Sequence, residues 1–196
     1  MLLITPRLVL RPYCMEHAEA MNKWANDLDL NYYDDDRPEP PEPVALEKTV
    51  SMLRRIVEST DKGIIRFAIH KQEDDAFIGI CMIALIDRHN RRCNLGISIG
   101  ETSQWGKGYG RESVLAMVEH CFGSLNMNRI GVEVYAYNDR SLSMFARLGF
   151  VTEGRIRQAV WKRGEFADSV IMGLLQTEWL GSSAGGLTAE LSRSEV

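Results

Sequence analysis

The sequence has few cysteines, no long apolar run and no excess of positive charge, and each shortage excludes a class of protein. Cys14, Cys81, Cys93 and Cys121 contain no CxxC pair, so we predict that they fill the core and that no metal is bound. No apolar stretch is long enough to cross a membrane. The net charge of -4 gives no electrostatic case for binding nucleic acid or an anionic membrane surface.

The N-terminal segment also lacks the pattern of a secretory signal, because Arg7 and Arg11 interrupt its apolar residues. We therefore expect a cytoplasmic protein in a reducing compartment. A chain of 196 residues can bury a sizeable core, and we expect one domain over residues 1–180. Residues 181–196 are small and polar, and we expect them to form a flexible tail.

Helical and strand-like segments alternate along the chain. Helices are expected at 15–28, 44–58, 111–125 and 141–149, and strands at 5–12, 64–70, 77–86, 94–100, 130–137, 150–159 and 168–175. Four prolines and several carboxylates predict a loop over 31–43. The turns that join 64–70, 77–86 and 94–100 are short, which favours an antiparallel meander in a mixed α+β fold.

The stretch GETSQWGKGYGRES, residues 100–113, concentrates glycine around Lys107. A nucleotide P-loop would need Ser or Thr after the lysine, but Gly108 follows it. A dinucleotide fingerprint would need glycine where Arg111 stands. Both of these phosphate sites are therefore disfavoured.

A third kind of phosphate cradle agrees with this spacing. Gly106, Gly108 and Gly110 remove side chains from a turn that leads into the helix expected from Arg111. Backbone N–H groups at a helix N-terminus bind anions, and a pyrophosphate needs no metal there. A glycine-rich turn without a ligand is the alternative, but three such glycines cost conformational entropy.

Two segments resemble the GNAT superfamily of N-acetyltransferases. QWGKGYGRES is similar to its acetyl-CoA pyrophosphate loop, and NDRSLSMFARLGF, residues 138–150, is similar to its Asn-x-x-Ser/Ala…Leu-Gly-Phe segment. TPRLVLRP and EGRIRQAVWKRGEFADSVIMGLL resemble the branch that acetylates ribosomal-protein N-termini and polyamines. The resemblance implies a mostly antiparallel, twisted sheet of six to seven strands with about four helices, splayed between its fourth and fifth strands.

The resemblance also implies which residues bind acetyl-CoA. The pantetheine arm would pair with the fourth main strand at Ile97, Ser98 and Ile99, where an N–H would also face the thioester carbonyl. Asn138 would hydrogen-bond the same arm, although asparagine also favours a helix N-terminus. The pyrophosphate would be held by Trp105, Gly106, Lys107, Gly108, Tyr109, Gly110 and Arg111.

The catalytic residues are less well defined by the resemblance. Ser141 matches a small residue near the thiol, where its hydroxyl could hydrogen-bond the leaving thiolate. Phe145 would contact the cofactor at a position where many members carry a proton-donating tyrosine. Val160 and Asn94 stand where other members carry acids. An amine must lose a proton before attack, and Glu133 and Tyr135, Glu101 or a water chain are the alternatives for this role.

The expected loop over 31–43 overhangs the acceptor site in this fold. Tyr32 and Tyr33 could supply an apolar wall or a cation–π contact there. Asp34, Asp35 and Asp36 could bind a polyamine or a basic N-terminus, and a solvated acidic loop is the alternative.

The resemblance implies an acetyl-CoA-dependent N-acetyltransferase that acts by direct attack of a primary amine in a ternary complex. The acceptor is expected to be a protein N-terminus or a polyamine-like small amine. Because members of this branch are often dimers, a homodimer is the expected assembly. The alternative is a non-catalytic acyl-CoA sensor or scaffold of the same fold, which the missing ionisable groups at 94, 145 and 160 would suit.

Overall fold

The computed structural model describes residues 1–34 and 42–181, and an eight-stranded sheet organises this part of the chain. Every neighbouring pair of strands is antiparallel except β5 and β6, so the meander expected from the short turns is confirmed as β3–β4–β5. In sheet order the strands are β1 (Leu3–Ile4), β2 (Leu8–Arg11), β3 (Ile65–Lys71), β4 (Phe77–Asp87), β5 (Arg92–Ser98), β6 (Arg129–Tyr135), β8 (Glu165–Leu175) and β7 (Val151–Lys162).

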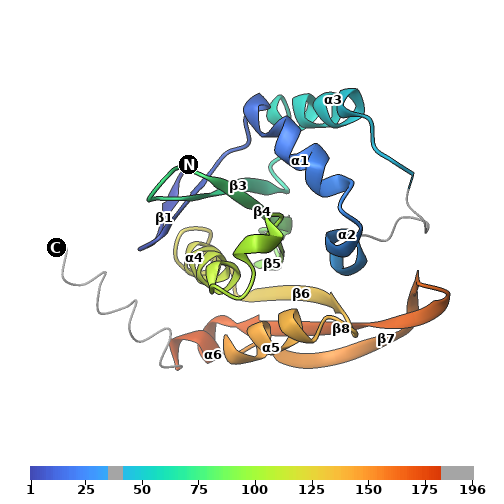
Figure 1. Cartoon of the computed structure of the whole chain (residues 1–196). Helices are drawn as coiled ribbons and strands as arrows, with labels where there is room; N and C mark the ends of the chain where they lie inside the picture. The colour runs from blue at the N-terminus through green and yellow to red at the C-terminus, as the bar shows by residue number, and fades with distance from the viewer. Residues whose placement is uncertain (35–41, 182–196) are drawn as a thin grey trace.

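Helices lie on both sides of this sheet. Figure 1 shows α1 and α3 on one side of β3 and β4, and α4 on the other. The additional elements are β1, α2 and α6, which are too short to leave a periodic pattern in the sequence. The helices are α1 (Ala18–Ala25), α2 (Leu28–Asp34), α3 (Leu46–Val57), α4 (Tyr109–Gly123), α5 (Asp139–Arg147) and α6 (Gln176–Leu180), with short 3-10 turns η1 (Met15–His17) and η2 (Thr102–Gln104).

The main core forms where α4 and α5 pack against the sheet. On the inward face of α4, Val114, Met117, Val118 and Cys121 are all fully buried. A second apolar cluster joins α1, α2 and α3. Helix α3 buries only part of its apolar side chains. Leu53 is buried beside Thr49, whereas Leu46 and Val57 are exposed because the helix turns its Thr49–Leu53 edge inward.

The loop expected over 31–43 is wrong for its first residues, since α2 extends to Asp34. The carboxylate of Asp27 accepts hydrogen bonds from the N–H groups of Asp29 and Leu30, both at 3.0 Å. This N-terminal cap and the burial of Leu30 stabilise a helix that the acidic composition obscured. Residues 35–41 and the tail from 182 lie outside the described residues.

The splay between β5 and β6 creates space beside the sheet. The two strands pair only from Arg92 to Asn94 on one side and from Arg129 to Gly131 on the other. Asn94 packs so closely over Gly131 that a Cβ on the glycine would lie 2.7 Å from the amide oxygen. Beyond this contact the strands diverge, so the last residues of β5 have no strand partner on the β6 side among the described residues.

Candidate active site

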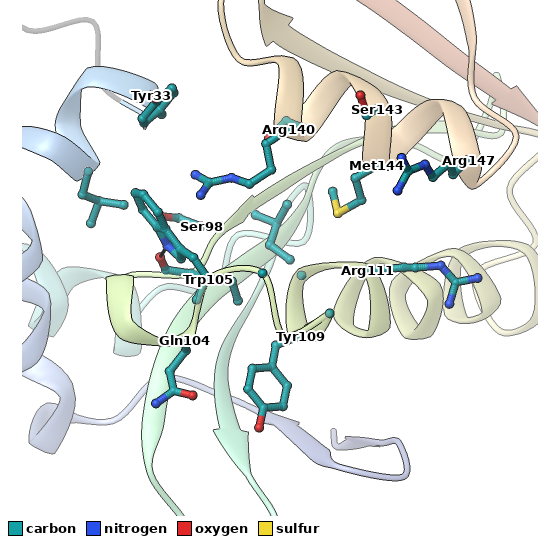
Figure 2. Close-up of a pocket in the computed structure, with 17 residues that line it drawn as sticks. Tyr33, Ser98, Gln104, Trp105, Tyr109, Arg111, Arg140, Ser143, Met144 and Arg147 are labelled. Carbon is teal, nitrogen blue, oxygen red and sulfur yellow. Dashed lines mark hydrogen bonds between the residues drawn. The ribbon is translucent and has the colours of Figure 1, made fainter.

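A cavity of about 470 Å³ opens where β5 leaves β6. Its walls come from α2, the end of β5, the loop after η2, the first turn of α4, and α5 (Figure 2). The structure brings many of the predicted residues together around this one space. They are Tyr33, Ile97, Ser98, Ile99, Trp105, Gly106, Gly108, Tyr109, Gly110, Arg111 and Ser141.

The glycine turn has the geometry of an anion cradle. Gly106 and Gly108 adopt left-handed backbone angles, with φ of 76° and 85°. Gly108 is the N-cap of α4 and supplies no side-chain cap. The N–H groups of the first helical turn have no intrahelical acceptor, and they join the positive end of the helix dipole at the cavity wall. These N–H donors suit a pyrophosphate, so the residues of this turn fit the pyrophosphate of coenzyme A.

Arg7, just before β2, braces the cradle from outside the cavity. Its guanidinium donates to the Lys107 carbonyl at 3.0 Å and forms an ion pair with Glu112 at 2.6 Å. Burial opposes ionisation of Glu112, but hydrogen bonds from Thr5 and Arg7 outweigh it and lower the pKa of this carboxyl. The turn is therefore held to the neighbouring strand by a charged pair.

Trp105 forms the wall between the cradle and β5. Its indole N–H donates to the Ile99 carbonyl at 2.6 Å, which fixes the indole against the strand end. The Ile99 carbonyl oxygen therefore already accepts one hydrogen bond within the protein. The neighbouring backbone of Ile97 and Ser98 still lines the cavity.

Helix α5 supplies the opposite wall. Asn138 is its N-cap, and its side-chain oxygen accepts from the Ser141 N–H at 3.2 Å. The helix-terminal role anticipated for Asn138 is therefore present. Ser141 reaches the cavity, whereas Asn138 is buried behind it.

The sequence reasoning missed the cavity-facing stripe of α5. Arg140, Met144 and Arg147 line the cavity at intervals of four and three residues, so they lie on one face of the helix. This spacing was legible in NDRSLSMFARLGF.

Three residues expected to bind the cofactor do not line the cavity. The Lys107 amine donates to the Gln104 side chain at 3.0 Å. The side-chain oxygen of Asn138 accepts from the Ser141 N–H at the start of α5. Phe145 is buried in the main core, with its ring 5.2 Å from that of Phe150. It faces inward because α5 uses that edge to pack on the sheet.

The acids and phenol considered for proton transfer are also outside the lining. Glu133 is exposed on β6, between the buried Val132 and Val134. Tyr135 stacks on Tyr137 at 5.5 Å. Glu101 forms a 2.8 Å ion pair with Lys23, and hydrogen bonds from Lys23 and Trp24 lower its pKa.

The expected acceptor residues separate into three groups. Tyr33 lines the cavity, 6.1 Å from the Trp105 ring. Tyr32 stacks on Tyr137 at 4.7 Å instead, and its backbone carbonyl accepts from the Tyr137 hydroxyl. Asp34 ends α2, but its side chain, Asp35 and Asp36 lie outside the described residues.

The two remaining family positions have structural roles. Val160 is buried on β7 opposite Ala167, and Asn94 closes the paired part of β5 and β6.

Among the described residues, no helix is long and apolar enough to cross a membrane.

Comparison with known proteins places this geometry in a family. The model of the acetyltransferase (GNAT) domain matches residues 7–151. The chain belongs to the GNAT acetyltransferase family, and its class of enzyme is N-acetyltransferase.

Individual relatives refine this picture. The chain is 31% identical to an uncharacterized N-acetyltransferase, p20, of Bacillus licheniformis over 91% of this chain and 98% of the relative. It is 29% identical to the [ribosomal protein uS5]-alanine N-acetyltransferase of Escherichia coli over 58% of each chain. The crystal structure of spermidine N-acetyltransferase from Vibrio cholerae, in complex with CoA and spermine, superposes with a TM-score of 0.78. That likeness covers 90% of this chain and 99% of the other at 22% identity, which shows the shared fold.

Proposed function

We propose that this enzyme transfers the acetyl group of acetyl-CoA to a primary amine, by direct attack within a ternary complex. The observation that carries the proposal is the continuous cavity that joins the free edge of β5 to the glycine cradle of α4. One wall offers strand backbone and the other offers unpaired helix N–H groups, which together suit an extended arm that ends in a pyrophosphate.

Each part of acetyl-CoA has a matching part of this cavity. The backbone of Ile97, Ser98 and Ile99 would pair with the pantetheine arm. The Ile99 carbonyl already accepts a hydrogen bond from the Trp105 indole N–H. Gly106 to Arg111 would hold the pyrophosphate. The thioester supplies the activated acetyl group, and an N–H of β5 would donate to its carbonyl oxygen as negative charge develops there.

Proton transfer is assigned to small groups and water. Ser141 reaches the cavity and would hydrogen-bond the leaving thiolate. The described residues that line the cavity include no carboxylate or imidazole, so a chain of water molecules would carry the proton of the ammonium group to bulk solvent. Glu133 and Tyr135 do not line the cavity, so neither is proposed as the base that accepts the proton of the amine.

The acceptor is proposed to be a protein N-terminus or a small amine. Named relatives act on the alanine of ribosomal protein uS5 and on spermidine, which supports an amine acceptor of either kind. We also propose a cytoplasmic location and a homodimer, in keeping with the family resemblance.

Coenzyme A release with a thiol-reactive dye tests the proposal. The panel holds spermidine, spermine, amino acids, aminoglycosides and short peptides with free N-termini, and thermal shift reports acetyl-CoA binding in parallel. Turnover with one class supports the proposal and names its acceptor. Stabilisation without any turnover would favour the acyl-CoA sensor, and no stabilisation would refute the cradle.

A further inference from the structure

Arg140 holds a position in the cavity that the proposed acetyl-CoA contacts do not explain. Its guanidinium lies 3.8 Å above the Trp105 ring and 5.4 Å from the centre of the Tyr33 ring. Figure 2 shows it reaching from α5 toward these two rings, whereas Arg111 and Arg147 lie toward the other end of the cavity. Three separate elements therefore converge on one cation, namely α5, the loop after η2, and α2.

Helix stability does not account for this arginine. Arg140 is the second residue of α5, where the positive end of the helix dipole disfavours a cation. No carboxylate among the described residues lies within ion-pair distance of it. Its partners among the described residues are aromatic faces, which leave the N–H edge of the guanidinium available.

Arg140 lies apart from Arg147, the other arginine that α5 contributes to the cavity. Arg147 follows Arg140 by seven residues, which separates them by about 10 Å along the helix axis. Arg147 is therefore placed to contact another part of a bound ligand than Arg140, which reaches the Tyr33 side of the cavity. That side is where the acceptor amine would meet the thioester.

We propose that Arg140 binds a carboxylate carried by the acceptor, so that the enzyme acetylates a small amine bearing a carboxylate group. This inference rests on the proposed function and narrows its acceptor. A stacked guanidinium presents two parallel N–H donors that match a carboxylate bidentately. The same cation repels a polyamine, and the described lining residues contain no acidic group to offset it. The carboxylate would fix the acceptor while its amine points toward the β5 backbone.

Matched acceptor pairs test this inference directly. L-phenylalanine is compared with L-phenylalaninamide, L-methionine with its amide, and L-lysine with cadaverine, by coenzyme A release. The amide carries the less basic amine, so intrinsic reactivity at neutral pH favours the amide over the acid. We expect the carboxylate member of at least one pair to have a kcat/KM at least tenfold higher.

Two arginine variants assign the preference to a residue. Arg140→Gln should bring the kcat/KM ratio of the pair close to one, and Arg140→Lys should retain part of it because the charge stays but the bidentate edge is lost. Arg147→Gln is the matched control, from the same face of the same helix. It should raise the KM for acetyl-CoA and leave the acceptor ratio unchanged. Unfolding temperatures measured for all variants confirm that they are folded.

The outcomes separate this inference from the proposed function. Turnover of the amides or cadaverine without preference for the carboxylate would overturn the role of Arg140 and leave amine acetylation intact. An unchanged ratio in Arg140→Gln would do the same. Absence of turnover with every pair, while a peptide or polyamine is acetylated, would overturn the role of Arg140 and leave the proposed function intact. Absence of turnover with the pairs and with the whole panel, in protein that acetyl-CoA stabilises, would count against both.

Discussion

The cradle at α4 makes a sharp prediction because the chain contains a matched pair of glycines. Gly106 and Gly164 have φ of 76° and 87°, and a Cβ built on either meets no other atom within 4 Å. Gly106 lines the cavity, whereas Gly164 lies in the turn between β7 and β8. Substitution by alanine therefore imposes similar backbone strain at both positions, and only one of them is at the proposed ligand site.

The strain can be estimated in advance. An alanine in the left-handed region costs about 1–2 kcal/mol, and 1 kcal/mol shifts Tm by about 2–4 °C in a chain of this size. Gly106→Ala and Gly164→Ala should each lower Tm by about 2–8 °C. At Gly106 the added methyl also enters the cavity and displaces an anion from the N–H donors. A lost hydrogen bond to a charged group costs about 1.5–3 kcal/mol, or about tenfold to a hundredfold in Kd.

Two assays distinguish the strain from the ligand effect. Thermal unfolding without ligand measures the first, and calorimetric titration with acetyl-CoA measures the second. Gly164→Ala should bind acetyl-CoA with the Kd of the unmodified protein. If Gly106→Ala loses the same stability as Gly164→Ala and keeps the same Kd, the cradle is not the pyrophosphate site and our reasoning is refuted.

Three further substitutions test other parts of the structure. Trp105→Phe keeps an aromatic ring, though a smaller one, and leaves the Ile99 carbonyl without its donor. The free energy of unfolding should therefore fall by about 1 kcal/mol, and kinetics should show a several-fold higher KM for acetyl-CoA. Glu101→Gln should leave the pH profile of kcat/KM unchanged, because Lys23 and Trp24 hold that carboxylate ionised; loss of an ionisation from the profile would instead make Glu101 the base. His17→Gln should weaken the loss of stability between pH 6.5 and 4, as measured by urea unfolding.

The sequence was informative where a local pattern has one physical solution. Glycine spacing before an amphipathic segment predicted the turn and the helix start, and Gly106, Gly108 and Gly110 all line the cavity. Asn138 was expected near a helix start and caps α5. In each case the decisive interaction spans only a few residues along the chain.

The remaining features depend on contacts between distant segments. The burial of Phe145 depends on how α5 packs against the sheet, because a helical phenylalanine can face a core or a groove equally well. Arg140 meets Trp105 and Tyr33 from elements far apart in the sequence, so its environment has no local signature. The carboxylate of Glu101 accepts from Lys23 and Trp24, which are distant in the sequence, so its engagement has no local signature either.

The acid sensitivity of His17 follows from a hydrogen-bond chain that has no room for another proton. His17 Nδ1 accepts from the Cys14 N–H at 3.1 Å, so the ring proton is on Nε2, which donates to His70 Nε2 at 3.1 Å. His70 Nδ1 in turn donates to the Asp75 carbonyl at 2.8 Å. Burial, followed by electrostatic repulsion from His70 and Arg11, lowers the pKa of His17 from 6.5 to about 4.

Because that pKa is lower in the folded state, the unfolded chain binds the extra proton first as the pH falls. The stabilising contribution is complete above about pH 6.5 and is lost progressively down to about pH 4, and 2.5 pKa units correspond to about 3 kcal/mol. His17→Gln removes this titration, so its free energy of unfolding should change less with pH over that interval. An identical pH dependence in the variant and the unmodified protein would mean that His17 does not titrate as this hydrogen-bond chain requires.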